Sequence, residues 1–357
     1  MSNYEIIGLM SGTSLDGLDI AHVRFDFTNN SNDSFVLLNA DTVPIPDELL
    51  HKLMDAPNYS VAQLLMLDKE FGGFLANAVL KFIEKKKIVK NNIHAIASHG
   101  QTILHQPNNG FTLQIGCGST LSYQTNINVI NDFRTKDIVA GGQGAPLVPI
   151  GDFGLFSDLA EGFLNIGGFA NVSFKKENTI VAYDICPGNL PLNKLAHAKD
   201  LAYDKNGEIA KSGEINFFLL DLLNSIDYYS LEGPKSLGTE WIEEFYYPLL
   251  KFDKEIENNL RTVVEHTAIQ ISNVLNAAEL KSVLVTGGGA KNGFLIERIQ
   301  HYFNGELILP EQKIIDFKEA IVFAYLGALY LDKRPNAISS VTGAKKSTIG
   351  GVFHLPG

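Results

Sequence analysis

The chain of 357 residues has few cysteines and no excess of positive charge. Its two cysteines, Cys117 and Cys186, cannot form a disulfide framework, and the N-terminus lacks the basic and apolar regions of a secretory signal. The formal charge of -11 argues against binding to nucleic acid or to an acidic membrane. The most apolar helical segment, residues 320–331, is too short to cross a bilayer. We therefore expect a soluble, cytoplasmic protein that holds any bound phosphate with local groups.

Two common catalytic motifs are missing as well. Lys346 and Ser347 could end a Walker A loop, but Lys345 stands where that loop requires glycine. Ser11 and Ser14 both lack the G-x-S-x-G frame of a serine hydrolase. The sequence therefore favours neither a P-loop nor a serine nucleophile.

A glycine-rich loop between two strands is the most informative feature that is present. Residues 4–7 form the first predicted strand and residues 20–27, with alternating apolar side chains, form the second. The glycines between them let backbone N–H groups approach a phosphate, and carboxylates there can hold hydrated Mg²⁺. The groups that we predict to bind a nucleotide are Gly12, Thr13, Ser14, Leu15, Asp16, Gly17, Leu18 and Asp19. An ordinary hairpin, with Asp16 as a turn cap, is the alternative.

The same pattern begins again in the second half of the chain. Strand residues 163–166 lead into a tight loop at residues 167–171, which contains Gly167, Gly168 and Asn171, and a return strand follows. A further strand, residues 179–183, ends at Asp184, which is either a functional carboxylate or a turn cap. Two hairpins of one kind predict a duplicated pair of lobes that hold a polyphosphate between them.

A third glycine turn feeds a helix. The buried strand at residues 282–286 is followed by Gly287, Gly288, Gly289 and Asn292, and then by a helix at residues 294–302. This turn resembles a dinucleotide fingerprint, with Glu311 as a ribose ligand, but the spacing is G-x-G-x-x-x-G. An adenosine-binding site at this turn, with the phosphates held by the two hairpins, accounts for all three glycine segments.

Polar residues follow several strands of the first half, after an amphipathic helix near residues 60–86. His99 and Gln101 follow one strand and Arg134 follows another, which suggests the rim of a cleft. The break at residues 141–146 looks like a connector. We therefore expect a first lobe of residues 1–135, with a tail of about 340–357, and a second lobe of residues 136–339.

Taken together, these features resemble the actin, hexokinase and heat-shock chaperone superfamily, whose α/β fold has duplicated ribonuclease H-like domains around an interdomain cleft. More narrowly, several motifs look like the anhydro-N-acetylmuramic acid kinase family. They are residues 8–17, 98–102, 132–134, 140–147, 165–168 and 286–289. The resemblance implies ATP-dependent conversion of 1,6-anhydro-N-acetylmuramic acid, with water as co-substrate, to N-acetylmuramic acid 6-phosphate in cell-wall recycling.

The resemblance also implies roles for individual residues. Asp184 begins the family's D-x-G-P-G-N motif and corresponds to its catalytic aspartate, which would remove a proton from water. The two hairpins correspond to the phosphate loops and residues 287–289 to the adenosine site, with Mg²⁺ held through water by Asp16 and Asp19. Cys186 stands where the family has glycine, and Cys117 where an acid is commoner.

Four residues are predicted to contact the sugar: His99, Gln101, Arg134 and Glu319. Arg134 could bind the lactyl carboxylate or pair with Asp132 or Asp137, and Glu319 could accept from a sugar hydroxyl or stabilise the start of a helix. A kinase of another amino sugar and a non-enzymatic ATP-driven scaffold remain the alternative functions. The family resemblance suggests a homodimer.

Overall fold

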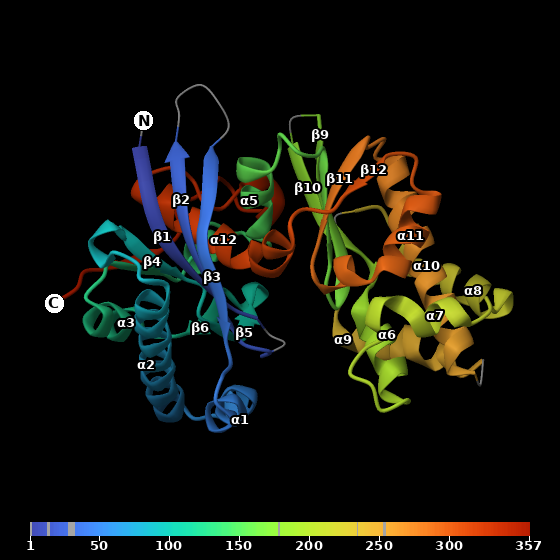
Figure 1. Cartoon of the computed structure of the whole chain (residues 1–357), viewed down its shortest axis with the longest axis horizontal. Helices are drawn as coiled ribbons and strands as arrows, with labels where there is room; N and C mark the ends of the chain where they lie inside the picture. The colour runs from blue at the N-terminus through green and yellow to red at the C-terminus, as the bar shows by residue number, and fades with distance from the viewer. Residues whose placement is uncertain (1, 13–14, 28–32, 178, 234, 253–254) are drawn as a thin grey trace. The chain divides into compact units, whose positions relative to one another are not determined.

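The computed structural model describes residues 2–12, 15–27, 33–177, 179–233, 235–252 and 255–357. It divides into a first unit of Met1–Phe156 with Phe317–Gly357 and a second unit of Ser157–Asp316. This division differs from the expected one, because residues 136–156 and 317–339 fall in the first unit. The reason is packing: Gly151 of α5 (Val148–Leu155) lies against Val322 of α12 (Gln312–Leu331). Figure 1 shows the late helix α12 beside the early strands.

The first unit is built on a six-stranded sheet of order β13-β7-β4-β1-β2-β3. Strands β1 to β3 are antiparallel neighbours, whereas β4 and β7 run parallel to β1, and β13 closes the edge beside β7. The strands are β1 Ser2–Ser11, β2 Leu18–Phe27, β3 Ser34–Val43, β4 Ala95–Ser98, β7 Val129–Asn131 and β13 Val352–His354. Strands β5 (Gln101–Gln106) and β6 (Phe111–Ile115) form a separate hairpin. The strand-turn-strand prediction for the first loop is confirmed.

Helices cover both faces of this sheet. Ile7 and Leu9 of β1 share a core with Phe71 and Leu75 of α2 (Val61–Lys86), which confirms the predicted amphipathic helix. On the other face, a Cβ atom on Gly8 would overlap the Ala320 carbonyl oxygen of α12. Only glycine allows this approach of strand and helix. The remaining helices of the unit are α1 Asp47–Asp55, α3 Gly118–Thr125, α4 Thr135–Val139 and α13 Ser339–Thr342.

The second unit repeats this topology in a five-stranded sheet of order β10-β9-β8-β11-β12. In both sheets the unit's first strand is followed on one side by two strands in antiparallel pairing and on the other side by two strands in parallel pairing. The first sheet has one further strand, the antiparallel β13, at its edge. The strands are β8 Gly162–Ile166, β9 Phe169–Lys176, β10 Thr179–Pro187, β11 Ser282–Thr286 and β12 Glu306–Ile308. The shared order confirms the predicted duplication, which no residue-by-residue repeat reveals.

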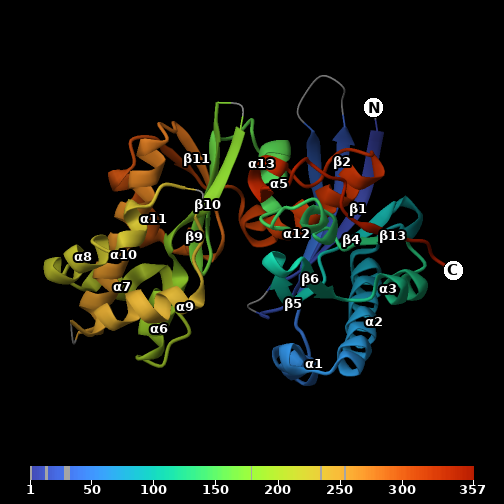
Figure 2. The same ribbon diagram turned by 180° about the vertical axis from the view of Figure 1, so that it is seen from behind.

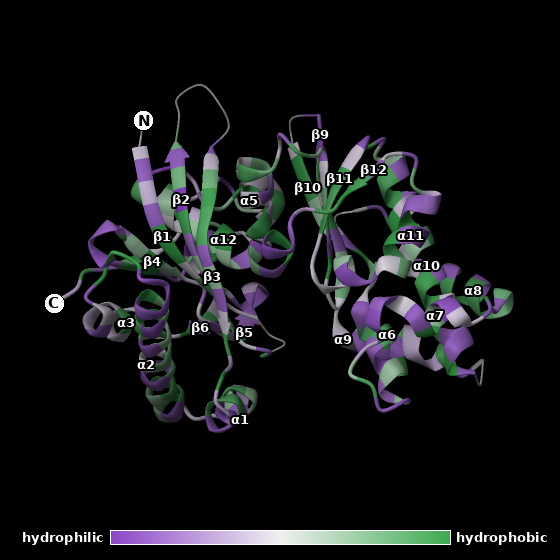
Figure 3. Cartoon of the chain, in the orientation of Figure 1, coloured by the Kyte–Doolittle hydropathy of each residue, from purple (hydrophilic) through white to green (hydrophobic). Residues whose placement is uncertain are grey.

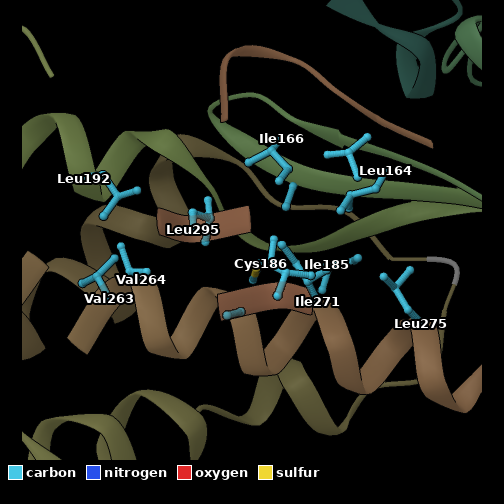
Figure 4. Packing of buried hydrophobic residues seen from close by; sticks show 14 of the residues in the cluster. Leu164, Ile166, Ile185, Cys186, Leu192, Val263, Val264, Ile271, Leu275 and Leu295 are labelled. Atoms are coloured by element: carbon cyan, nitrogen blue, oxygen red, sulfur yellow. The ribbon is translucent and has the colours of Figure 1, made fainter. Parts of the chain in front are cut away.

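A dense apolar core joins this sheet to its helices. Leu164 and Ile166 of β8 pack with Ile271 of α10 (Ile256–Ala277) and Leu295 of α11 (Gly293–Tyr302), as Figure 4 shows. The view from behind in Figure 2 shows the same helices beside the sheet. The other helices of the unit are α6 Asn189–His197, α7 Glu208–Ser212, α8 Phe217–Asn224 and α9 Thr239–Trp241.

Apolar residues are distributed as the sheets and helices require. Figure 3 shows apolar positions along much of α5 and α12 in the first unit. Residues 320–329 of α12 are buried throughout, which confirms the predicted core helix. Among the described residues, no helix is long and apolar enough to span a bilayer.

Candidate active site

The first glycine hairpin connects β1 and β2, which pair in register from Ser2 opposite Phe27 to Ser11 opposite Leu18. In the turn, the Leu15 N–H donates to the Gly12 carbonyl over 3.2 Å. A Cβ atom on Gly17 would lie 2.8 Å from the Thr42 methyl carbon, so this position has room only for glycine. Thr13 and Ser14, two of the predicted phosphate ligands, lie outside the described residues.

The two predicted metal partners differ in their surroundings. Asp16 is exposed in the turn, whereas Asp19 lies in β2 and accepts a hydrogen bond of 2.6 Å from the Thr42 hydroxyl. Leu18 is fully buried in the first unit's core, so its side chain is part of the packing. Any contact of Leu18 with a nucleotide would come from its backbone.

His99 and Gln101, which were expected at the rim of a cleft, are buried in the structure. The Ser11 hydroxyl at the end of β1 donates to Gln101 Oε1 over 2.6 Å. The His99 ring lies 4.7 Å, centroid to centroid, from the ring of Phe323 in α12. Both side chains are buried because α12 and the β1–β2 hairpin cover the end of β4, and sequence alone does not show that these elements meet.

Arg134 follows β7 and reaches the same place. Its Nη2 lies 2.9 Å from His99 Nε2, and its Nη1 donates to the Gly144 carbonyl over 2.7 Å. The two aspartates considered as ion-pair partners bind elsewhere: Asp132 accepts from the Thr135 N–H, and Asp137 accepts from the Gly144 N–H and the Thr342 hydroxyl. Burial lowers the pKa of Arg134 to about 10, although nearby Glu319 acts in the opposite direction. The guanidinium remains charged at neutral pH.

Glu319 lies well inside α12, because the helix begins at Gln312 rather than near residue 319. A role at a helix N-terminus is therefore wrong. Burial raises the pKa of Glu319, Lys318 and Arg134 lower it, and Asp19 acts to raise it. Glu319 therefore shares an electrostatic environment with Arg134 and with Asp19 of β2.

In the second unit, three predicted segments converge around Asn189. The second hairpin joins β8 and β9 at Gly167 and Gly168. The Asn189 N–H donates to the Gly167 carbonyl over 2.8 Å, and its side-chain amide donates to the Ile166 carbonyl over 3.2 Å. A Cβ atom on Gly288 would lie 3.4 Å from that amide nitrogen. Asn189 thus connects the hairpin, the segment after β10 and the turn after β11.

Asp184 does not end its strand, which corrects the sequence-based expectation. Strand β10 continues to Pro187, and a bulge interrupts its register with β9 between Asp184 and Cys186. In this bulge Ile185 has no partner on β9, and pairing resumes at Cys186. Asp184 lies directly opposite Asn171, so two predicted site residues are cross-strand neighbours.

A segment that the sequence reasoning missed holds Asp184 in place. The Leu237 N–H donates to Asp184 Oδ2 over 2.9 Å, and the Asp184 N–H donates to the Lys235 carbonyl over 3.0 Å. Tyr228 donates its hydroxyl to the Asp184 carbonyl over 2.7 Å. The dipeptide Gly233-Pro234 and Gly238 are the sequence signals of a turn there. Burial raises the pKa of Asp184, and the Leu237 hydrogen bond opposes that shift.

The third glycine turn packs directly on the second hairpin. Gly287 has φ +83°, and a Cβ atom on it would lie 2.7 Å from the Ile166 carbonyl oxygen. Gly289 is equally enclosed, because a Cβ atom at this position would overlap the Ile166 Cγ2 methyl group. Asn292 caps α11 by accepting from the Leu295 N–H over 3.1 Å, so its side-chain oxygen is engaged within the helix.

Cys186, which stands where the resembling family has glycine, fits its place without strain. Its side chain is fully buried in the second unit's core beside Ile185, as Figure 4 shows. Cys186 is not among the described non-glycine residues that have a positive φ, so the backbone there does not need glycine. The thiol fills core volume, and the Asp184 carboxylate still accepts from the Leu237 N–H.

We expect Cys186→Gly to destabilise the protein by about 2 kcal/mol, because the variant loses buried volume and gains freedom in the unfolded chain. Urea unfolding followed by circular dichroism measures the change. Cys186→Ala, which keeps the Cβ atom, should lose about half as much. Equal stability of wild type and Cys186→Gly would show that the thiol contributes nothing to packing.

Cys117, the second departure, caps a helix. Its Sγ accepts from the Thr120 N–H at the start of α3 over 3.5 Å and lies 2.8 Å from Lys69 Nζ. Burial raises the pKa of the Cys117 thiol, but the hydrogen bonds from Lys69 and Thr120 outweigh it, and the net pKa is lowered from 9.0. An acid could accept the same two hydrogen bonds.

Cys117→Ala should therefore cost about 1 kcal/mol of stability through loss of the helix cap. Cys117→Asp should recover most of this loss, because its carboxylate accepts from the same N–H and faces Lys69. Thermal unfolding of the three proteins checks the order. An aspartate variant no more stable than the alanine variant would exclude capping as the role of this residue.

Two α/β units of one topology, each with a glycine hairpin at its central strand, define the actin-like and hexokinase-like fold class. A sequence profile described as anhydro-N-acetylmuramic acid kinase matches residues 4–355. The chain belongs to the anhydro-N-acetylmuramic acid kinase family.

Curated relatives match this chain over all or nearly all of their length. An anhydro-N-acetylmuramic acid kinase of Sulfurovum sp. (strain NBC37-1) is 36% identical over 99% of this chain and 100% of its own. The enzyme of that name from Shewanella denitrificans is 39% identical over 97% of this chain and 96% of its own. A solved structure, the activator of the 2-hydroxyisocaproyl-CoA dehydratase from Clostridium difficile with bound ADPNP, is similar at 13% identity and a TM-score of 0.45, covering 92% of this chain and 97% of its own.

Proposed function

We propose that this protein uses ATP and water to convert 1,6-anhydro-N-acetylmuramic acid to N-acetylmuramic acid 6-phosphate, a step of cell-wall recycling. The observation that carries the proposal is the setting of Asp184. Its carboxylate, held by the Leu237 N–H over 2.9 Å, lies on a bulge opposite Asn171 in the strand pair that the second glycine hairpin begins. Family membership supplies the substrate class.

Asp184 is the proposed general base. It takes a proton from water while the water oxygen forms a bond to C1 of the sugar. The C1–O6 bond breaks with its electron pair on O6, and O6 attacks the γ-phosphorus, so that ADP leaves. The Leu237 hydrogen bond favours the charged form that a base requires, and burial makes that carboxylate more basic than an exposed one.

The first unit provides the proposed sugar-binding groups. Arg134 and Glu319 offer a half-buried cation and a half-buried acceptor of hydrogen bonds, which suit a lactyl carboxylate and a sugar hydroxyl. Gln101 is fixed by Ser11, so its amide group is available in one orientation. A muramic sugar presents both a carboxylate and hydroxyls, whereas an amino sugar without a lactyl group would leave Arg134 without its anion.

Gly287 and Gly289 let the third turn pack closely on Ile166 of the second hairpin, because a Cβ atom at either position would meet that residue. Two glycine segments are thereby side by side, and their backbone N–H groups are the proposed ligands of ATP. Mg²⁺, held through water by Asp16 and Asp19, would neutralise charge on the phosphates. A cytoplasmic location and a homodimer are parts of the same proposal.

Incubation with Mg-ATP and the anhydro sugar in ¹⁸O-labelled water tests the reaction. We expect one ¹⁸O atom at C1 of the product and none in the transferred phosphoryl group, because water attacks carbon. Product without label at C1 would reject hydrolytic opening. Turnover of N-acetylglucosamine in preference to the anhydro sugar would instead favour a conventional kinase of another amino sugar.

The pH profile follows from the raised pKa of Asp184. A base works in its ionised form, so kcat/KM should fall as pH decreases through the raised pKa, which lies above the ordinary value of 3.8. The acid limb should therefore appear at a higher pH than an exposed aspartate would give. Any residual activity of Asp184→Asn should lack this limb, and an unchanged limb in that variant would assign the ionisation to another group.

A further inference from the structure

His99 is built into the first unit with both ring nitrogens engaged. Nδ1 lies 2.9 Å from the Gly100 carbonyl oxygen, and Nε2 lies 2.9 Å from Arg134 Nη2 and 3.3 Å from Arg134 Nε. A carbonyl oxygen only accepts and a guanidinium only donates. These two contacts place the proton on Nδ1 and direct the Nε2 lone pair toward Arg134, with the Ser11 backbone as a further acceptor beside the ring.

We propose that His99 is a positioning residue, a neutral imidazole whose Nε2 orients the Arg134 guanidinium, and that it neither exchanges protons with the substrate nor touches it. The inference rests on the proposed function only in assigning the anion of the sugar to Arg134. It changes the role of His99 from the sugar contact that the sequence suggests to support for that contact.

The surroundings of His99 favour the neutral ring. Arg134 is a charged group in contact with the ring, Phe323 of α12 packs against the ring, and Glu319 acts electrostatically on the guanidinium. Burial, with a further contribution from Arg134, lowers the pKa of His99 to about 3. A protonated ring would bring an N–H group against the N–H groups of Arg134, so protonation would break the arrangement.

The other contacts of Arg134 complete a rigid frame. Nη1 donates to the Gly144 carbonyl, and the Gly144 N–H donates to Asp137, whose second oxygen accepts from Thr342. His99 and Gly144 thus hold the Nε–Nη2 edge and one Nη1 hydrogen. Nη1 and Nη2 carry two hydrogens each, so each nitrogen keeps one hydrogen for an anion. The contacts with His99 and Gly144 determine which N–H groups of the guanidinium face the ligand.

Replacing His99 with glutamine or with asparagine tests whether the ring positions Arg134 or transfers a proton. Gln at position 99 can place an oxygen near the Nε2 position, whereas Asn reaches only as far as Nδ1. We expect His99→Asn to raise KM for the anhydro sugar about tenfold with little change in kcat, and His99→Gln to raise it only about two- to threefold. KM for ATP should stay within twofold in both variants. His51→Gln, an exposed histidine of α1, is the matched control.

A measurement on the wild-type protein without substrate is independent of activity. Long-range ¹H–¹⁵N correlation spectra, with the His99 signals assigned from the His99→Gln variant, should show a protonated Nδ1 and an unprotonated Nε2 from pH 5.5 to 8.5. A ring that titrates near pH 6.5, a proton on Nε2, or an unchanged sugar KM in a folded His99→Asn variant would overturn the proposal. If the wild type fails to turn over the anhydro sugar while the spectra show the expected tautomer, only the proposed function fails.

Discussion

Asp184→Asn should reduce kcat by about a thousandfold and leave the dissociation constant for ATP within about threefold of wild type. A positioned general base contributes roughly 10²–10⁴-fold to rate. The amide of asparagine keeps the shape of the side chain and can still accept from the Leu237 N–H, but it cannot take a proton from water. Single-turnover kinetics measure the loss, and isothermal titration calorimetry measures nucleotide binding.

A matched control separates catalysis from a general effect of lost charge. Asp221 in α8 is an exposed aspartate of the same unit, and Asp221→Asn should leave kcat and KM unchanged. If Asp184→Asn keeps more than a tenth of wild-type kcat, Asp184 is not the base. If it instead loses ATP binding, its main contribution is to the shape of the nucleotide site.

Lys318→Met should lower the free energy of unfolding by about 3–5 kcal/mol, the cost of breaking a buried ion pair by removing one partner. Lys318 Nζ lies 3.0 Å from Asp152 Oδ1, and the side chains are only 4% and 5% exposed. The pair joins α12 to α5, and the variant leaves the Asp152 carboxylate buried without that cation. Urea unfolding followed by circular dichroism measures the change.

Replacing both partners tests the origin of this loss. Asp152→Leu combined with Lys318→Met should recover most of the stability, because no charge then remains buried at the pair. Lys313→Met, on the exposed face of the same helix, should change the free energy of unfolding by less than about 0.5 kcal/mol. A single Lys318→Met variant as stable as Lys313→Met would show that solvent reaches the pair.

Local patterns predicted the elements that local physics controls. The alternation after the first loop, the three- and four-residue spacing in α2 and the glycine turn before α11 all correspond to elements of the structure. Backbone sterics and the burial of one face act over a few residues, so their signal is present in short windows of sequence. The family motifs contribute independently, because they are matched along nearly the whole chain.

Short windows of sequence could not predict the contacts between residues far apart in the chain. The Leu237 N–H that holds Asp184 comes from 53 residues further along the chain, and the packing of α12 on β1 joins residues more than three hundred positions apart. Contacts of this kind also bury His99, which packs against Phe323 of α12. Their hydrogen bonds form only once the sheets and helices have assembled.

The amino-acid sequence by itself determined the glycine hairpins, the order of strands and helices around them, the family and the identity of the acid at position 184. Only the tertiary structure decided that Arg134 meets His99 and Gly144 rather than an aspartate, and that residues 317–339 pack in the first unit. The physical reason is that a turn needs only its own residues, whereas the partner of a buried charge is chosen by what the folded chain brings within hydrogen-bond distance.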